Sequence, residues 1–119
     1  MAVRLRVPPV DDPDFFAEVD FTTGAVLRLV GSADTIATPE LAALLQTLHG
    51  ELIAKALPEI VVDLRDLDFM AATCVRELVH WIEGARYKIR LRSNPTIVWQ
   101  RHALPALSCF DTTLVTVEV

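Results

Sequence analysis

Two periods of apolar residues along the chain predict its secondary structure. The stretches 16–21 and 25–31 are rich in apolar and β-branched residues, and they flank the turn-like spacer Thr22-Thr23-Gly24. This arrangement predicts a β-hairpin. An earlier alternating stretch, 3–7, is cut off by Pro8-Pro9, which indicates a short edge strand or an ordered tail.

The next segment carries apolar residues at helical spacing. Leucines recur on one side of a helix that begins near Pro39 and is bounded by Pro58, at Leu41, Leu44, Leu45, Leu48 and Leu52. Pro39 suits the first helical position and Glu40 the positive end of the helix dipole. The stretch 59–64 is too short and too β-branched for a helix, so it predicts a strand buried on both faces.

The second half of the chain repeats this alternation. A second helical stripe is formed by Val75, Leu78, Val79 and Ile82. The stretch 87–93 alternates as a strand, a third helix is predicted from Thr96, and 113–119 predicts a closing strand. The order β-β-α-β-α-β-α-β predicts an α/β fold whose mixed sheet has four to five strands with helices packed on it.

This order also predicts which parts are central. Val61 should lie on a central strand, and the helices from Pro39 and from Thr73 should pack side by side. The side chains of Leu45, Leu48, Leu78 and Ile82 should then be buried. We expect one domain over residues 17–119, preceded by an N-terminal strand or tail over 1–16.

Composition narrows the class of protein. A chain of 119 residues with 52% apolar residues can bury a core without disulfides or metal. No apolar run approaches the ~20 residues that cross a membrane, and residues 1–16 lack a signal-peptide core. The two cysteines lie far apart and form no metal motif. These features predict a cytoplasmic protein without membrane insertion.

Charge is spread unevenly. The net charge is −5, with five Lys/Arg against twelve Asp/Glu in residues 1–70 and six against four in residues 71–119. The negative total argues against nucleic-acid binding, which relies on phosphate neutralisation. The basic face of the 87–93 strand, at Lys88, Arg90 and Arg92, is either an anion-docking site or an edge strand protected by its charges.

Catalytic motifs are absent from the sequence. There is no G-x-G-x-x-G, P-loop or G-x-S-x-G, and the three histidines lie apart on different predicted helices. Asp63, Asp66 and Asp68 fit a strand-end acid followed by a solvated loop better than a metal cluster. We therefore expect no enzyme activity, no cofactor and no metal.

The junction between the third predicted strand and the second helix resembles a known family. The stretches VLRLVGSADTIATPELAALL (26–45) and IVVDLRDLDFMAATCVREL (60–78) are similar to the corresponding segments of the STAS domain family, which includes bacterial anti-sigma-factor antagonists. Gly31 and Asp34 match the family's Gly-x-x-Asp entry to its first helix. The resemblance implies the STAS fold from about Val19 onward.

The chain departs from the family's phosphorylation motif. Ala71 stands where the family has Asp, Ala72 where it has the phosphorylated Ser, and Cys74 where it has Gly. Alanine accepts no phosphoryl group, so the usual switch is absent. Thr73 keeps a hydroxyl at the helix start, where it is either a plain N-cap or a remaining phosphoacceptor.

The resemblance implies a regulatory module that binds a protein partner in signal transduction and transcription regulation. The implied partner is an anti-sigma factor or a serine kinase of the histidine-kinase-like ATPase type. The implied contact residues are Asp34, Ala71, Ala72, Thr73 and Arg76. Two alternatives stay open: a constitutive small subunit of a transporter-associated or stress-sensing assembly, and a small-ligand or nucleotide sensor that uses the basic strand. A homodimer is also possible.

Overall fold

The protein is described here by a computed structural model, which covers residues 10–11, 14–22, 24–107 and 115–118. Six strands form one sheet in chain order: β1 (Val10–Asp11), β2 (Phe15–Asp20), β3 (Ala25–Ala33), β4 (Glu59–Met70), β5 (Lys88–Arg92) and β6 (Val115–Glu118). The helices are η1 (Thr35–Ala37, a 3-10 turn), α1 (Thr38–Ala54), α2 (Ala72–Glu83) and α3 (Val98–Leu107). In the described residues, no helix is long and apolar enough to span a membrane.

The sheet is mixed, as predicted. β1, β2 and β3 pair antiparallel, whereas β3, β4, β5 and β6 pair parallel. The predicted hairpin is β2 and β3, and Val61 lies on β4 between β3 and β5. The two-residue β1 was not predicted, and the strand predicted at 3–7 lies outside the described residues. The domain boundary predicted after residue 16 falls within β2, so Phe15 and Phe16 belong to the sheet.

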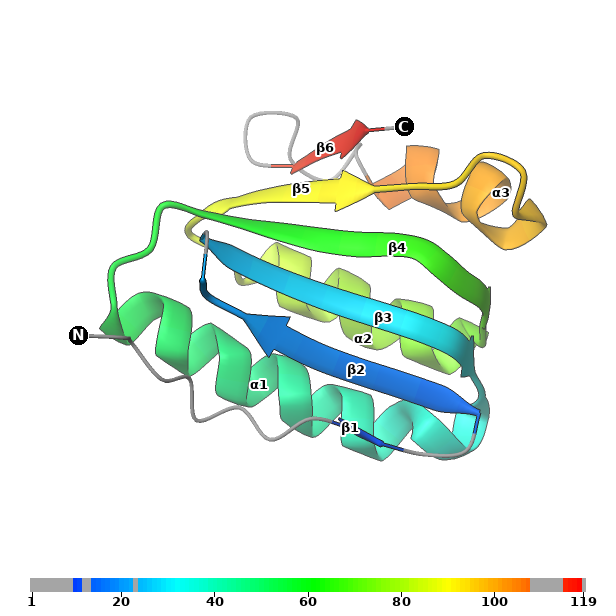
Figure 1. Ribbon diagram of the computed structural model, residues 1–119, viewed down its shortest axis with the longest axis horizontal. Helices are drawn as coiled ribbons and strands as arrows, with labels where there is room; N and C mark the ends of the chain where they lie inside the picture. Colours follow the sequence, from blue (N-terminus) through cyan, green and yellow to red (C-terminus); the bar gives the residue numbers. More distant parts are fainter. Residues whose placement is uncertain (1–9, 12–13, 23, 108–114, 119) are drawn as a thin grey trace.

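Two helices cover the same face of this sheet. Figure 1 shows α1 and α2 side by side behind the strands. The four side chains predicted to be buried on these helices, Leu45, Leu48, Leu78 and Ile82, are all buried. The predicted packing of the two helices is therefore confirmed, and the helix starts must lie close together.

β4 is longer than predicted. The sequence indicated a strand over 59–64, but pairing with β3 continues to Met70 through two shifts of register. α3 supports this second part, since the buried Gln100 amide donates to the carbonyls of Leu64 and Leu67, the latter at 3.1 Å. Side chains 65, 66, 68 and 69 are exposed. These exposed positions interrupt the apolar pattern, so a prediction from periodicity alone ends the strand too early.

Gly31 sets the course of the chain at the end of β3. Its φ is +96°, and a Cβ at this position would collide with the backbone carbonyl of Asp14. The close approach lets the Ser32 N–H donate to that carbonyl at 2.7 Å. This geometry requires glycine and directs the chain from β3 towards Asp34.

A polar pair links α1 to the segment before β5. His49 Nδ1 and the Tyr87 hydroxyl are 2.8 Å apart, and Tyr87 is buried. Burial raises the pKa of Tyr87 to about 12, opposed in part by the nearby Trp81 indole. The phenol therefore stays protonated in the folded protein at neutral pH.

Tyr87 offers a test of this burial by pH. Because the folded pKa lies above the ordinary value of 10.0, Tyr87 contributes stability below pH ~10, and that contribution is lost as pH rises towards about 12. Tyr87 is the only tyrosine in the chain, so phenolate absorbance reports it alone. We expect absorbance to rise only well above pH 10, together with unfolding. A midpoint near 10 in protein that is still folded would contradict this.

Candidate functional site

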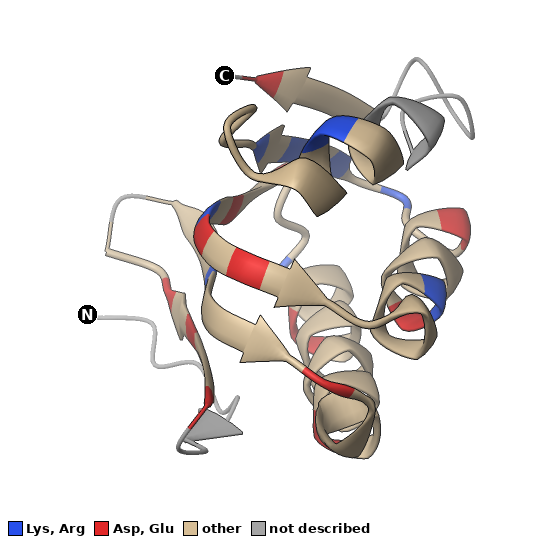
Figure 2. Ribbon diagram, turned by 90° about the vertical axis from the view of Figure 1, so that its right-hand side faces the viewer, with Lys and Arg blue, Asp and Glu red and all other residues tan. Residues whose placement is uncertain are grey.

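The carboxyl ends of β3 and β4 meet at one edge of the molecule. The Ala71 N–H donates to the Ala33 carbonyl at 2.7 Å, so the two strands end in register. In Figure 2 the two neighbouring strands each lead into a helix, and the helix starts lie close to one another. The structure thus brings Asp34 next to the start of α2, two segments that the sequence places almost forty residues apart.

Asp34 is exposed, but its side chain is engaged locally. Its carboxylate accepts the Thr35 N–H and caps the 3-10 turn η1. Its backbone carbonyl accepts a hydrogen bond from the Cys74 thiol at 3.3 Å. The carboxylate is therefore held in a fixed place at the surface, facing solvent beside α2.

The start of α2 is small and uncharged. Ala71 occupies the N-cap without a side-chain hydrogen bond, and Ala72, the first helical residue, is exposed. The interpretation of Thr73 as the N-cap is therefore wrong. Thr73 lies one residue beyond Ala72 inside the helix, where its hydroxyl is 2.8 Å from that of Thr38 and half-buried.

Thr38 joins the two helix starts. Its hydroxyl contacts Thr73 and also lies 3.3 Å from the thiol of Cys74, which is fully buried. This small cluster fixes the spacing between α1 and α2 at the junction. Nothing in the local sequence around Thr38 could reveal it, because the contact spans 35 positions along the chain.

Two large apolar side chains are exposed at this junction. Ile36 is 80% exposed and Phe69 is 48% exposed. Phe69 is the cross-strand partner of Ser32, and Ser32 lines a hollow of about 60 Å³ together with Asp34 and Ile36. Ile36 lies on η1 and Phe69 near the end of β4, and exposed apolar side chains that share a surface mark protein-interaction sites.

The amino-acid pattern contains only a weak indication of these two residues. Ile36 is the only large apolar residue in the polar stretch SADTIATPE. It precedes the stripe of leucines that predicts the buried side of the first helix. We call Ile36, Phe69, Ala72, Asp34 and Arg76 together the junction surface. Arg76 is exposed on α2, so this surface carries one positive and one negative group beside its uncharged side chains.

Asp66 and Asp68, which were predicted to lie in a solvated loop, belong to the second part of β4. Arg28 pairs with Asp66 at 3.3 Å, and the hydrogen bonds from Arg65 hold the pKa of Asp63 below its usual range. Asp68 is exposed. Across the described ranges, no group of three or more His, Cys, Asp or Glu could hold a metal ion.

The basic strand is partly neutralised by neighbouring strands. Arg90 binds Glu59 at 2.9 Å and Glu118 at 3.0 Å, and these carboxylates raise its pKa. Lys88 is exposed and Arg92 half-buried. The blue bands of β5 lie apart from the ends of β3 and β4 in Figure 2. Anion docking by these three residues stays a prediction, with Arg90 already engaged.

Comparison with known proteins gives the fold. No family model and no curated protein matches the sequence. An anti-sigma factor antagonist from Mycobacterium paratuberculosis matches with a TM-score of 0.66 and 18% identity over 92% of this chain and 90% of that one.

A second solved structure agrees. The Bacillus cell fate determinant SpoIIAA in its phosphorylated form matches with a TM-score of 0.59 and 18% identity, over 87% of this chain and 91% of that one. At this identity the likeness concerns the fold. The chain therefore has the fold of the anti-sigma factor antagonists, as the resemblance in its sequence implies.

Proposed function

We propose that the protein is a non-enzymatic regulatory module that binds a protein partner through the junction surface. The observation that carries this proposal is the exposure of Ile36 and Phe69 beside Ala72, where β3 and β4 end. Solvation of these apolar groups is unfavourable, so covering them with a partner releases free energy. The likeness to anti-sigma factor antagonists supports the same class of function.

The junction surface has the composition of a small protein interface. Such interfaces place apolar and aromatic anchors at the centre and polar groups at the rim. Here Ile36 and Phe69 supply the anchors. Asp34 and Arg76 lie at the rim, where an ion pair with the partner would govern orientation and association rate more than affinity.

The partner binds constitutively in this proposal. A phosphoserine switch adds nearly two negative charges at a surface that the partner must cover. Ala72 has no hydroxyl, and the Thr73 hydroxyl is half-buried and bonded to Thr38. A kinase would have to break this contact to reach Thr73. The start of α2 therefore stays uncharged, and the partner can bind without a dephosphorylation step.

The partner class follows from the resemblance and from the neighbouring structures. We propose a cytoplasmic anti-sigma factor or a related serine kinase as the first candidate. Loss of the phosphorylated position also suits a constitutive subunit of a larger assembly, which would use the same surface. Identification of the bound protein distinguishes the two.

We expect the partner to depend on the two anchors. The protein is used to capture its partner from native lysate, and the captured protein is then purified and titrated by calorimetry. Ile36→Ser and Phe69→Ser should each weaken binding by about tenfold or more, because buried anchors dominate interface energies. Ile53→Ser is the matched control, since Ile53 is 46% exposed near the other end of α1.

Comparison with the Ile53→Ser control also defines the results that would contradict the proposal. Ile53→Ser should leave the affinity unchanged, and circular dichroism should show all three variants folded. If the anchor variants bind as tightly as the original protein, or if only Ile53→Ser loses binding, the partner uses another surface.

A further inference from the structure

The second part of β4, residues 64–70, is paired with β3 but with no other of the described strands. The pairing of β4 with β5 ends at Asp63, opposite Arg92, whereas its pairing with β3 continues to Met70. In Figure 1, α3 lies beside this part of β4, where the neighbouring strand β5 has already ended. A strand that loses a neighbour leaves backbone groups without partners, and burial of such groups is costly.

Side chains of α3 take the place of the missing strand. The Gln100 amide is only 1% exposed, and it donates to the carbonyls of Leu64 and Leu67, the latter at 3.1 Å. The Trp99 indole N–H donates to the same Leu67 carbonyl at 2.8 Å. Both lone pairs of this carbonyl oxygen are therefore used by donors from α3.

Asn94, in the connection between β5 and α3, completes the arrangement. Its backbone N–H donates to Gln100 Oε1 at 2.7 Å, so that the amide nitrogen of Gln100 faces β4. Its side-chain amide donates to the Arg65 carbonyl at 3.3 Å. We call Asn94, Trp99 and Gln100 together the α3 clamp.

The part of β4 that the clamp holds is irregular. Its register against β3 shifts between Arg28 and Val30 and again between Gly31 and Ser32, and each shift places one extra residue on β4. Such bulges bend a strand and re-aim its side chains. Phe69 follows directly after the second shift, opposite Ser32, and is 48% exposed. The clamp thus holds the stretch of strand that leads to Phe69.

We infer, on the basis of the proposed function, that the α3 clamp is a positioning element for the partner: its donors keep β4 in the bulged course that presents Phe69 at the junction surface. Gln100 serves the carbonyls of Leu64 and Leu67, and Leu67 lies two residues before Phe69. Without these donors the buried carbonyls turn towards solvent, and Phe69 leaves the position in which the partner meets it. The clamp residues therefore affect binding through Phe69.

Replacing Gln100 by glutamate tests the clamp at a single atom. Gln100→Glu keeps the shape of the side chain and the oxygen that accepts from Asn94, but a carboxylate oxygen replaces the donor that faces the carbonyls of Leu64 and Leu67. At about pH 8 the carboxylate repels both carbonyls. The amide signals of residues 64–71 should then move in the NMR spectrum of ¹⁵N-labelled protein, whereas those of β2 should stay in place.

The affinity for the captured partner is the second readout. At about pH 8, calorimetry should give Gln100→Glu a Kd about tenfold larger than that of the original protein, because only molecules that hold Phe69 in place bind. At about pH 5 the protonated carboxyl group can donate to one carbonyl again. The difference from the original protein at the same pH should then shrink to about threefold or less.

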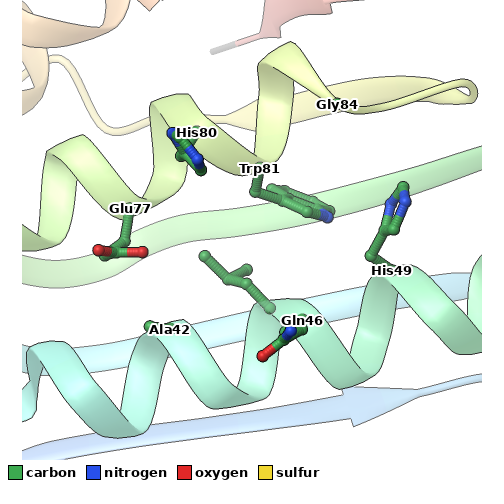
Figure 3. A pocket seen from close by; sticks show the side chains of 8 residues that line it. Ala42, Gln46, His49, Glu77, His80, Trp81 and Gly84 are labelled. Atoms are coloured by element: carbon green, nitrogen blue, oxygen red, sulfur yellow. The ribbon is translucent and has the colours of Figure 1, made fainter.

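Matched variants separate positioning from other effects. Gln46→Glu makes the same chemical change at the only other glutamine, which is exposed on α1 beside the groove between α1 and α2 (Figure 3). Leu52→Ala lowers the stability by removing a fully buried side chain near the far end of α1. Both should leave the affinity and the amide signals of 64–71 unchanged. Trp99→Phe removes one donor from a carbonyl that keeps its bond to Gln100, so it should move the same signals by less, even if Gln100→Glu does not fold.

Three results would overturn the inference. The first is that neither Gln100→Glu nor Trp99→Phe moves the signals of 64–71. The second is that Leu52→Ala weakens binding as much as Gln100→Glu does, which would mean that affinity only follows stability. The third is that the signals move and the affinity stays the same, although Phe69→Ser weakens binding. If Phe69→Ser also binds as the original protein does, the proposed function fails and the clamp has no role in binding, while the NMR spectra, recorded without a partner, still show whether α3 holds β4.

Discussion

Replacing Leu78 by alanine is expected to lower the free energy of unfolding by about 2–5 kcal/mol. Leu78 is fully buried on the face of α2 that packs against the sheet. The substitution removes apolar contacts and leaves a cavity that the surrounding rigid strands cannot close. A loss of this size is a large part of the stability of a domain of this length.

Urea unfolding followed by circular dichroism measures this effect. Glu83→Ala is the control, because Glu83 is exposed on the same helix and its loss should change the free energy of unfolding by less than about 0.5 kcal/mol. A Leu78→Ala variant that behaves like this control would mean that α2 does not pack on the sheet as described.

Replacing Ala72 by aspartate is expected to weaken partner binding by about a hundredfold or more while leaving the fold intact. The added carboxylate would be desolvated at the centre of the junction surface, and partial pairing with Arg76 one helical turn away would not offset the lost hydration, which costs several kcal/mol. The fold should tolerate it, because Ala72 is exposed at the first position of α2 and a negative charge there is favoured by the helix dipole.

Calorimetric titration of the purified partner gives the affinity of each variant. Ala54→Asp serves as the charge control, because Ala54 is exposed at the far end of α1. It should bind as the original protein does. Equal affinities for Ala72→Asp and Ala54→Asp would show that the partner does not cover the start of α2.

Periodicity was sufficient to predict the architecture. The leucine stripe of α1 and the stripe that includes Leu78 each have one buried side, which determines the helical face that meets the sheet. The mixed character of the sheet follows from a hairpin succeeded by alternating strands and helices. The central position of Val61 followed from a run of apolar residues without polar alternation.

The details of the junction could not be predicted in the same way. The exposure of Phe69 goes with the register shifts of β4 against β3, in a part of β4 that also receives a hydrogen bond from the distant Gln100 amide. The role of Thr73 was predicted from its place in the chain, yet its hydroxyl turns to Thr38, which is near only after folding. The residues that neighbour Thr73 and Phe69 in the sequence indicate neither contact, because each contact joins segments more than 30 positions apart.

We propose that the partner binds an unphosphorylated junction surface. Intact-mass analysis of the protein isolated from its own host, in the free and the partner-bound fractions, tests whether this surface carries a phosphate. We predict the unmodified mass in both fractions, because Ala72 has no hydroxyl and that of Thr73 is held by Thr38. A stoichiometric phosphate mapped to Thr73 in the free fraction, and absent from the bound one, would contradict the claim and show that the switch lies one residue further on.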